Sequence, residues 1–366
     1  MGNEVKLFVV VHYMADMMMM MGMGFLGFMS VTSSLVTLMY KDTLCQSYPA
    51  LSFLCPVTPT TAPAIAETSA PTTAPATTAA TTGGSNTGSL RKRFSPYLLL
   101  NNSSLGLIGT KSRWTTLAFV VGYANNKIQW DAGAVDMTNL KAKITAANKN
   151  GGGVIVSFGG QGAGAKGTRF LSELAGKYAD PVKLADAYGA IATALQSTWL
   201  DFDVEGAALK DSAAIDRRNK AIALLQKKRT DIRISFTVPT GLGGLDAPTK
   251  AMLSKAKNAG VKIDLVNIMA MYFTKSKTVM STATTKATAA SKPFIKSLGA
   301  KVGVTSQIGV NPDKPYTHEN FTTSDASKVV TALKSDGDVA LLSFWSLNND
   351  VAKHKGAFTK AFKAYN

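Results

Sequence analysis

The sequence predicts an α/β protein in which eight parallel strands close into a (β/α)8 barrel, preceded by a disordered stalk and a hydrophobic amino-terminal segment. Short apolar runs alternate with longer helical patterns through residues 94–366, and eight such runs can be counted. This stretch is 273 residues long, close to the roughly 250 residues typical of such a barrel. A chain of 366 residues that is 46% hydrophobic can bury a large core.

Residues 1–45 are predicted to be a hydrophobic leader. The stretch 17–40 holds 24 residues without a charge, and a helix rising about 1.5 Å per residue over that length could cross the roughly 30 Å core of a bilayer. Its serines, threonines and glycines weaken that interpretation. We expect a signal anchor or a secretory signal here, and a disordered amino terminus is the alternative.

Residues 46–93 are predicted to be a linker. Between residues 56 and 88 the sequence is almost entirely Thr, Ala, Pro and Ser, with no apolar periodicity. Such a composition cannot form a packed core, so we expect an extended, O-glycosylated stalk. Cys45 and Cys55 precede it and could form a disulfide in an oxidising compartment. These features predict a secreted protein, or one anchored to the cell surface through residues 17–40.

Residues 94–366 are predicted to form the barrel. The expected strands are 97–100, 116–123, 154–158, 199–205, 233–237, 265–272, 301–308 and 339–345, and helical patterns occupy 181–195 and 213–228. Connections of this length between strands favour parallel pairing, with helices outside the sheet. The glycine triplet at 151–153 precedes a strand instead of following one, so the sequence does not predict a dinucleotide site.

Three carboxylates occupy alternate positions of the expected strand 199–205. Alternation places Asp201, Asp203 and Glu205 on one face, and it turns the apolar residues between them towards the helices. Because neighbouring like charges cannot all ionise cheaply, at least one pKa must rise. Gly206 would end the strand, leaving Glu205 at the carboxyl rim as a candidate general acid. A calcium or magnesium site, or a solvated edge strand, are the alternatives.

This strand resembles the Asp-x-Asp-x-Glu signature of family 18 glycoside hydrolases, the chitinase family. The resemblance continues in order along the barrel. Residues 156–160 resemble the family's Ser-x-Gly-Gly third strand, and 266–272 its sixth. Residues 303–311 resemble the seventh strand of a bacterial-type subgroup, and 343–348 the eighth. The resemblance covers residues 94–366.

The resemblance implies a chitinase that hydrolyses β-1,4 bonds between N-acetylglucosamine units by substrate-assisted, retaining catalysis. Glu205 would then be the general acid and base. Asp203 would hydrogen-bond the acetamido N–H of the sugar, and Asp201 would share a proton with Asp203. The implied substrate-binding residues are Tyr272, Trp345, Met269, Tyr97 and Ser157. Trp345 would form the floor beneath the sugar, although an ordinary core tryptophan is an alternative.

One departure from the family pattern leaves other functions open. Tyr272 occupies the position of an aspartate on the family's sixth strand, so a weakened, chitin-binding lectin is one alternative. An endo-β-N-acetylglucosaminidase acting on N-glycans is another. We expect chitin or N-acetylglucosamine oligosaccharides as partners, no cofactor, no metal and a monomer. Despite the net charge of +17, the lysines are dispersed, so we expect no nucleic acid.

Overall fold

The computed structural model describes residues 90–122, 128–161, 179–274 and 276–365. The chain divides into two compact units, Met1–Ala79 and Ala80–Asn366. The predicted leader, the predicted anchor at 17–40, the Cys45–Cys55 pair and all but the last four residues of the predicted linker lie outside the described residues. Within the described ranges, no helix combines the length and the apolar character needed to cross a membrane.

A single curled sheet of parallel strands forms the centre of the second unit. Seven of its strands are β3 (Trp114–Gly122), β5 (Gly153–Gly159), β6 (Trp199–Asp203), β7 (Arg233–Pro239), β8 (Leu265–Ala270), β9 (Lys301–Gln307) and β12 (Val339–Trp345). Each pairs in parallel with the next one along the chain. The short β4 (Ile128–Trp130) runs antiparallel beside β3. All eight strands expected from the sequence are present; β12 matches its expected bounds, and the others have shifted ends.

The eighth strand is interrupted, and it joins the two ends of the sheet. It consists of β1 (Arg93–Phe94), which pairs with β12, and β2 (Tyr97–Leu99), which pairs with β3. Between them, the Ser95 N–H donates to the Leu342 carbonyl at 3.0 Å, and the Pro96 carbonyl accepts from the Thr116 N–H at 3.0 Å. The sheet therefore curls until its ends meet in one chain segment. We call this sheet and its covering helices the barrel.

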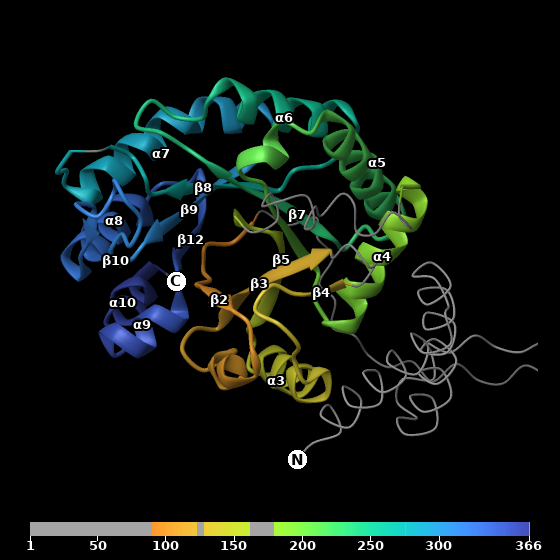
Figure 1. The fold of residues 1–366 in the computed structure, drawn as a ribbon, viewed down its shortest axis with the longest axis horizontal. Coiled ribbons are helices and arrows are strands. Elements are labelled where there is room, and N and C mark those ends of the chain that lie inside the picture. Colours follow the sequence, from red (N-terminus) through yellow and green to blue (C-terminus); the bar gives the residue numbers. More distant parts are fainter. Residues whose placement is uncertain (1–89, 123–127, 162–178, 275, 366) are drawn as a thin grey trace, which may run out of the picture. The chain divides into compact units, whose positions relative to one another are not determined.

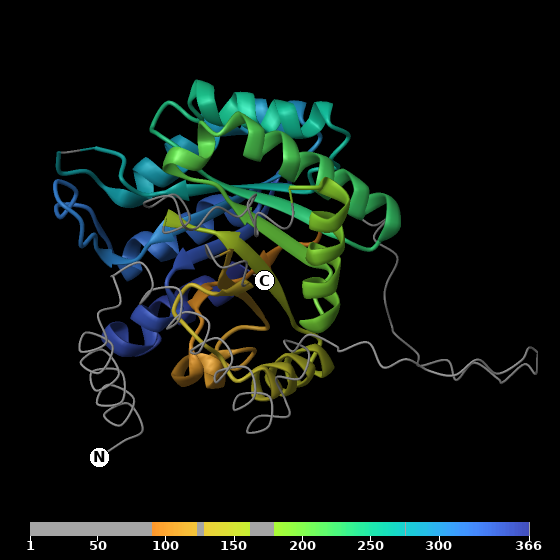
Figure 2. The same ribbon diagram turned by 45° about the vertical axis from the view of Figure 1, so that its right-hand side comes forward.

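Helices connect successive strands and lie on the outside of the sheet (Figures 1 and 2). They are α3 (Met137–Lys149), α4 (Pro181–Ala194), α5 (Ser212–Lys228), α6 (Ala247–Asn258), α7 (Met280–Ser297), α8 (Thr323–Lys334), α9 (Leu347–His354) and α10 (Ala357–Phe362). The 3-10 helices are η2 (Asn102–Leu107), η6 (Gly206–Leu209) and η7 (Lys363–Tyr365). An aspartate side chain caps α3, α4, α5 and α6 by accepting a backbone N–H of the first turn, which satisfies donors that a helix end leaves unpaired.

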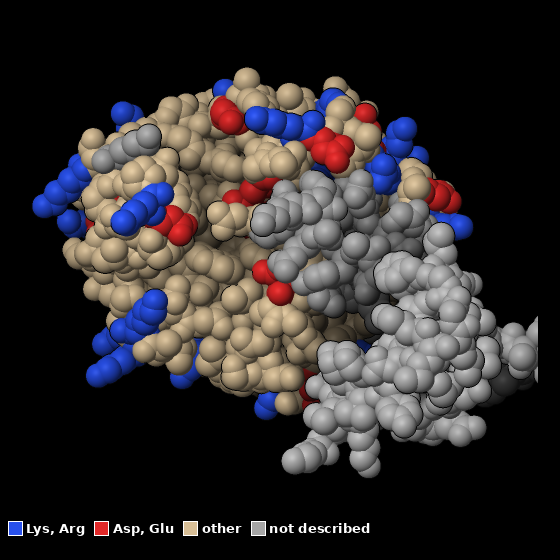
Figure 3. All heavy atoms as spheres, in the orientation of Figure 1, with Lys and Arg blue, Asp and Glu red and all other residues tan. Residues whose placement is uncertain are grey.

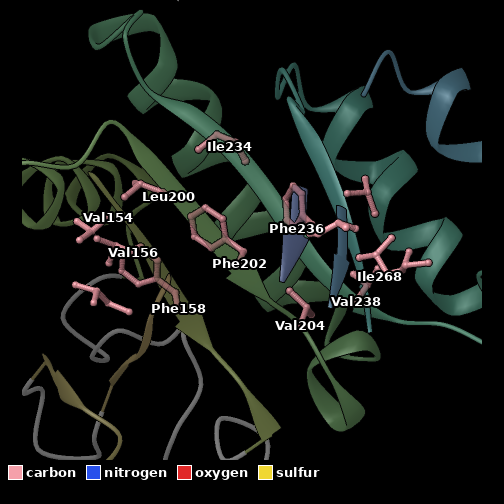
Figure 4. Close-up of a cluster of buried hydrophobic side chains, with 14 of the residues drawn as sticks. Val154, Val156, Phe158, Leu200, Phe202, Val204, Ile234, Phe236, Val238 and Ile268 are labelled. Atoms are coloured by element: carbon pink, nitrogen blue, oxygen red, sulfur yellow. The ribbon is translucent and has the colours of Figure 1, made fainter. Parts of the chain in front are cut away.

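The core between sheet and helices follows from strand alternation. As predicted, Leu200, Phe202 and Val204 turn away from the carboxylates of the same strand and are buried towards the helices (Figure 4). Phe202 lies in register with Phe158 of β5 and Phe236 of β7. The edge of Tyr188 from α4 packs against two of these rings, at centroid distances of 5.3 and 5.2 Å.

Two strands end earlier than the sequence predicts. The predicted 199–205 strand ends at Asp203, and the predicted 265–272 strand ends at Ala270. In each case the chain turns through a left-handed residue, Gly206 with φ 52° and Tyr272 with φ 58°, which an extended strand cannot contain. Glu205 and Tyr272 therefore lie beyond the sheet, at its carboxyl rim.

The barrel also begins earlier than predicted. Arg93, placed in the linker by sequence, is the first residue of β1. Its guanidinium lies over the ring of Trp114, 4.5 Å from the centroid. Lys92 donates to the carbonyl of Asp336 at 2.8 Å. These contacts attach the end of the predicted linker to the barrel.

Candidate active site

A cavity of about 260 Å³ opens where the strands end. Six of the residues predicted for the site line it: Tyr97, Asp203, Glu205, Met269, Tyr272 and Trp345. They come from β2, from β6 and the turn after it, from β8 and the turn after it, and from β12. The carboxyl ends of parallel barrel strands converge on one rim, so residues distant in sequence meet there.

Asp201 lies deepest and is held entirely by hydroxyl groups. It is 2% exposed. Its Oδ2 accepts from Ser157 at 2.7 Å and from Tyr97 at 3.0 Å. Its Oδ1 accepts from Ser235 at 2.6 Å, and Thr237 donates to both oxygens at 3.0 Å. Burial raises the pKa of Asp201, and these hydroxyl donors oppose that rise by favouring the carboxylate form.

The register of the sheet produces this network. Ser157 on β5 and Ser235 on β7 are the direct neighbours of Asp201 on β6. Ser235 also accepts a hydrogen bond from the Trp199 indole N–H at 3.0 Å. Ser157, expected to bind substrate, is not among the residues that line the cavity and instead donates to Asp201. Ser235 is a donor that the sequence analysis missed.

Asp203 and Glu205 form a hydrogen-bonded carboxyl pair at the floor of the cavity. Burial raises the pKa of Glu205 to about 7. Burial, followed by the charges of Glu205 and Asp201, raises the pKa of Asp203 well above its usual value. The pair therefore retains a proton at neutral pH. The expected sharing partner of Asp203 was Asp201, whereas here Asp203 bonds to Glu205.

One oxygen of Asp203 has no partner. Asp203 is 6% exposed, and its Oδ1 is a buried acceptor without a hydrogen bond in the described structure. A buried, unpaired carboxylate oxygen costs free energy. Because Asp203 lines the cavity, a bound molecule with an N–H or O–H could satisfy this oxygen.

Two glycines bring the third strand close to this pair. The Gly160 N–H donates to the Asp203 carbonyl at 3.1 Å. A Cβ on Gly159 would lie 2.2 Å from that carbonyl oxygen, and one on Gly160 would lie 2.7 Å from the ring of Phe119. The Gly-Gly pair after Ser157 is therefore needed for close approach between β5, β6 and the cavity wall.

Aromatic rings form one wall. Trp345 stacks on Phe119 with centroids 5.6 Å apart and planes at 21°. Tyr97 meets Trp345 edge-on at 6.1 Å. Trp345 is partly buried, packs against the cluster around Tyr97 and Phe119, and lines the cavity, which favours the expected floor position over that of an ordinary core tryptophan.

Tyr272 does not lie on β8 itself but in the turn that follows this strand. Its hydroxyl donates to Asp313, and its backbone N–H donates to Glu319 Oε2 at 2.8 Å. The side chain is 36% exposed and lines the cavity. Met269, the second-last residue of β8, also lines the cavity.

The side chains around the carboxylates bear on the alternative of a metal site. Among the described residues, no three side chains of the His, Cys, Asp or Glu type converge as ligands of one ion. Hydroxyl donors surround Asp201, and such donors suit an anion and not a competing cation.

Comparisons with known proteins agree with this geometry. No family model matches the chain. A probable bifunctional chitinase/lysozyme of Escherichia coli is 30% identical over 261 residues, covering 64% of this chain and 28% of that protein. The solved active domain 2 of a thermostable chitinase from Pyrococcus furiosus, studied as catalytic-site mutants complexed with chito-oligosaccharides, is 25% identical. It has a TM-score of 0.62 over 76% of this chain and 95% of that domain.

A third comparison concerns the fold alone. A family 18 chitinase from Pseudoalteromonas aurantia shares the fold with a TM-score of 0.53, at 17% identity, over 75% of this chain and all of that one (100%). The chain therefore resembles chitinases in sequence and has the fold of a family 18 chitinase. It spans only 28% and 47% of the two curated relatives that it matches.

The cavity is also lined by residues that the sequence analysis did not assign to the site. The cavity wall includes Thr237, Met271, Thr305, Gln307 and Phe119. Ser235 and Thr237 could have been predicted to face the site. They occupy alternate positions of β7, and the apolar residues on either side of them face the helices. No local signal marks Asp313 or Glu319, which reach Tyr272 from more than 40 residues away.

Proposed function

We propose that the barrel is a chitinase, which hydrolyses β-1,4 bonds between N-acetylglucosamine units with retention of configuration. The observation that carries the proposal is the Asp203–Glu205 pair at the floor of the cavity. The pair retains a proton at neutral pH that can be delivered to a leaving oxygen, and it presents an acceptor without a hydrogen bond, Asp203 Oδ1. An N-acetylated sugar needs both of these groups.

Each group has a place in the reaction. The protonated Glu205 gives its proton to the glycosidic oxygen as the C1–O bond breaks. The acetamido carbonyl oxygen of the same sugar attacks C1 and forms a cyclic oxazolinium, while Asp203 Oδ1 accepts the acetamido N–H. The Glu205 carboxylate then takes a proton from water, and the resulting hydroxide opens the ring at C1. Glu205 is thereby reprotonated, and the double inversion at C1 retains its configuration.

The walls of the cavity fit a neutral sugar. Among the described residues that line it, none is Lys or Arg, and the only acids are Asp203 and Glu205. Trp345 and Phe119 offer apolar ring surface, and Met269 offers a flexible apolar contact. Aromatic faces pack well against the C–H surface of a pyranose ring.

The test is hydrolysis of chitohexaose and of an aryl chitobioside by the purified chain and by Glu205→Gln. We expect the substitution to lower kcat by at least about 100-fold, because it removes general acid–base catalysis. The matched control is Asp186→Asn on the outer helix α4, where Asp186 pairs with Lys228 at 2.6 Å in solvent. This control should retain wild-type kcat. Equal rates for the wild type and Glu205→Gln would refute the proposal.

Two further measurements, of chitin binding and of glycan release, distinguish the chitinase from the alternative functions. If the chain binds chitin beads but does not hydrolyse chitin, it is a lectin. This alternative is considered because Tyr272 stands where the family pattern has an aspartate. Release of glycan from a high-mannose glycoprotein in preference to cleavage of chitohexaose would assign an endo-β-N-acetylglucosaminidase.

We further propose that the barrel is secreted or held at the cell surface, behind the Thr- and Pro-rich linker and the apolar stretch 17–40. Sequence composition alone supports this proposal. Fractionation of cells that express the full chain would test it, and a barrel found only in the cytosol would overturn it.

A further inference from the structure

A hairpin contacts the turn after β8 through a buried glutamate, Glu319, whose carboxylate accepts hydrogen bonds from the backbone of that turn. The hairpin comprises residues 309–321, in which β10 (Gly309–Val310) pairs antiparallel with β11 (Asn320–Phe321). Within it, the Asn311 N–H donates to the Glu319 carbonyl at 2.8 Å, and the Tyr316 N–H donates to the Asp313 carbonyl at 2.7 Å. These bonds fix the positions of the Asp313, Tyr316 and Glu319 side chains.

Glu319 holds the backbone of the turn that carries Tyr272. Its side chain is 1% exposed. It accepts from three successive backbone N–H groups, those of Tyr272 at 2.8 Å, Phe273 at 2.6 Å and Thr274 at 3.2 Å. Tyr272 has φ 58°, a left-handed conformation that is costly for a bulky residue and persists only when the surroundings enforce it.

The enforced conformation places an aromatic surface at the edge of the cavity. The Tyr272 ring meets Tyr316 edge-to-face, with centroids 5.1 Å apart and planes at 86°. Its hydroxyl donates to the exposed Asp313. Burial, followed by Asp313 and then the charges of Glu205 and Glu319, raises the pKa of Tyr272. The hydroxyl therefore stays protonated, and the ring lies within the electrostatic reach of Glu205.

We propose that Tyr272 and Tyr316 form a sugar-binding subsite next to the catalytic carboxylates, which takes a further N-acetylglucosamine unit of a longer chain, and that Glu319 is its positioning residue. This inference rests on the proposed function. The rings would pack against the apolar face of the sugar, and Asp313 would accept a hydrogen bond from one of its hydroxyls. The subsite favours oligosaccharides over short glycosides.

The test compares kcat/KM for chitohexaose with kcat/KM for an aryl chitobioside, in the full chain. Tyr316→Ala should lower the ratio of the two values about fivefold, as expected for the loss of one aromatic contact. Glu319→Gln should lower the same ratio, mainly by raising KM for the hexamer, because an amide cannot accept from three N–H donors. Val310→Ala is the matched control, because Val310 belongs to the same hairpin and its side chain is 58% exposed.

Three results would overturn the subsite. They are an unchanged ratio in Tyr316→Ala, an equal loss on both substrates, and the same change in Val310→Ala. If Glu319→Gln fails to fold, Tyr272→Phe provides a second variant, because it removes only the hydroxyl bonded to Asp313.

A binding measurement separates this inference from the proposed function. In the Glu205→Gln background, the affinity for chitohexaose is measured by calorimetry with and without Tyr316→Ala. Weaker binding in the double variant supports the subsite even if the wild type proves inactive. Equal affinity overturns the subsite even if the wild type is active.

Discussion

The three carboxylates of β6 and the turn after it have three different environments. Asp201 is surrounded by hydroxyl donors, Asp203 has one buried oxygen without a hydrogen bond, and Glu205 reaches the cavity from a turn. Strand alternation predicted that all three face inward. Asp201 and Asp203 lie on β6, and Glu205 reaches the same cavity as Asp203 from the turn after the strand. Their different roles could not be predicted, because they depend on Ser235, Thr237 and other donors supplied by neighbouring strands.

The pKa of Glu205 predicts the pH dependence of hydrolysis. Because the pKa is raised to about 7, the acid form that protonates the leaving oxygen is present below this pH and is lost above it. We therefore expect kcat/KM for chitohexaose to fall as pH rises through about 7. An aryl chitobioside with an acidic phenol should show a weaker fall, since its leaving group needs less protonation. A rate for chitohexaose that stays constant to alkaline pH would contradict this assignment.

At the scale of elements, alternation and length located the eight parallel strands of the barrel but not the ends that matter most. The end of β8 was misplaced because Tyr272 adopts a left-handed backbone conformation, whereas β6 ends early because its pairing with both neighbours stops at Asp203, although Glu205 is still extended. Gly206 is an ordinary signal for a left-handed turn. Tyr272 is not, since its conformation is imposed by Glu319 from a distant hairpin. The hairpin itself has strands of two residues, too short to produce a periodic pattern.

The aromatic row on the outer face of the sheet should dominate local stability. Phe202 is fully buried, with Phe158 stacked on it at 5.3 Å and Phe236 at 5.8 Å. Phe202→Ala should lower the free energy of unfolding by about 3–5 kcal/mol, from lost transfer energy and a new cavity. Urea denaturation measures this loss. Phe202→Leu, which leaves a smaller cavity, should cost less, and equal costs for the two variants would argue against packing as the cause.

At the scale of the whole molecule, charge and site are separated. Residues 91–366 contain 38 Lys and Arg against 19 Asp and Glu, a net charge of +19. Figure 3 shows Lys and Arg mainly around the edge of one face, whereas its hollowed centre is formed mostly by uncharged residues. The basic surface therefore attracts or repels an approaching charged molecule at long range, whereas the mostly uncharged cavity interacts with a molecule only once it is bound.

This separation predicts how salt affects a charged substrate. Partly deacetylated chitosan is a polycation, so the basic barrel should repel it. Its kcat/KM should rise as ionic strength increases from about 0.01 M to about 0.15 M, over which the Debye length falls from about 30 to about 8 Å. Neutral chitohexaose, assayed alongside, should respond little. A chitosan rate that is independent of salt, or that falls with it, would show that surface charge does not govern encounter.

The strand that joins the two ends of the sheet also sets when the cavity wall can be completed during synthesis. Residues 93–99 are made long before β12, yet β1 pairs with β12 and Tyr97 meets Trp345 across the same junction. A nascent chain that lacks β12 has an open sheet and no Trp345 in the cavity wall. The growing polypeptide therefore cannot complete this aromatic wall until β12 has left the ribosome.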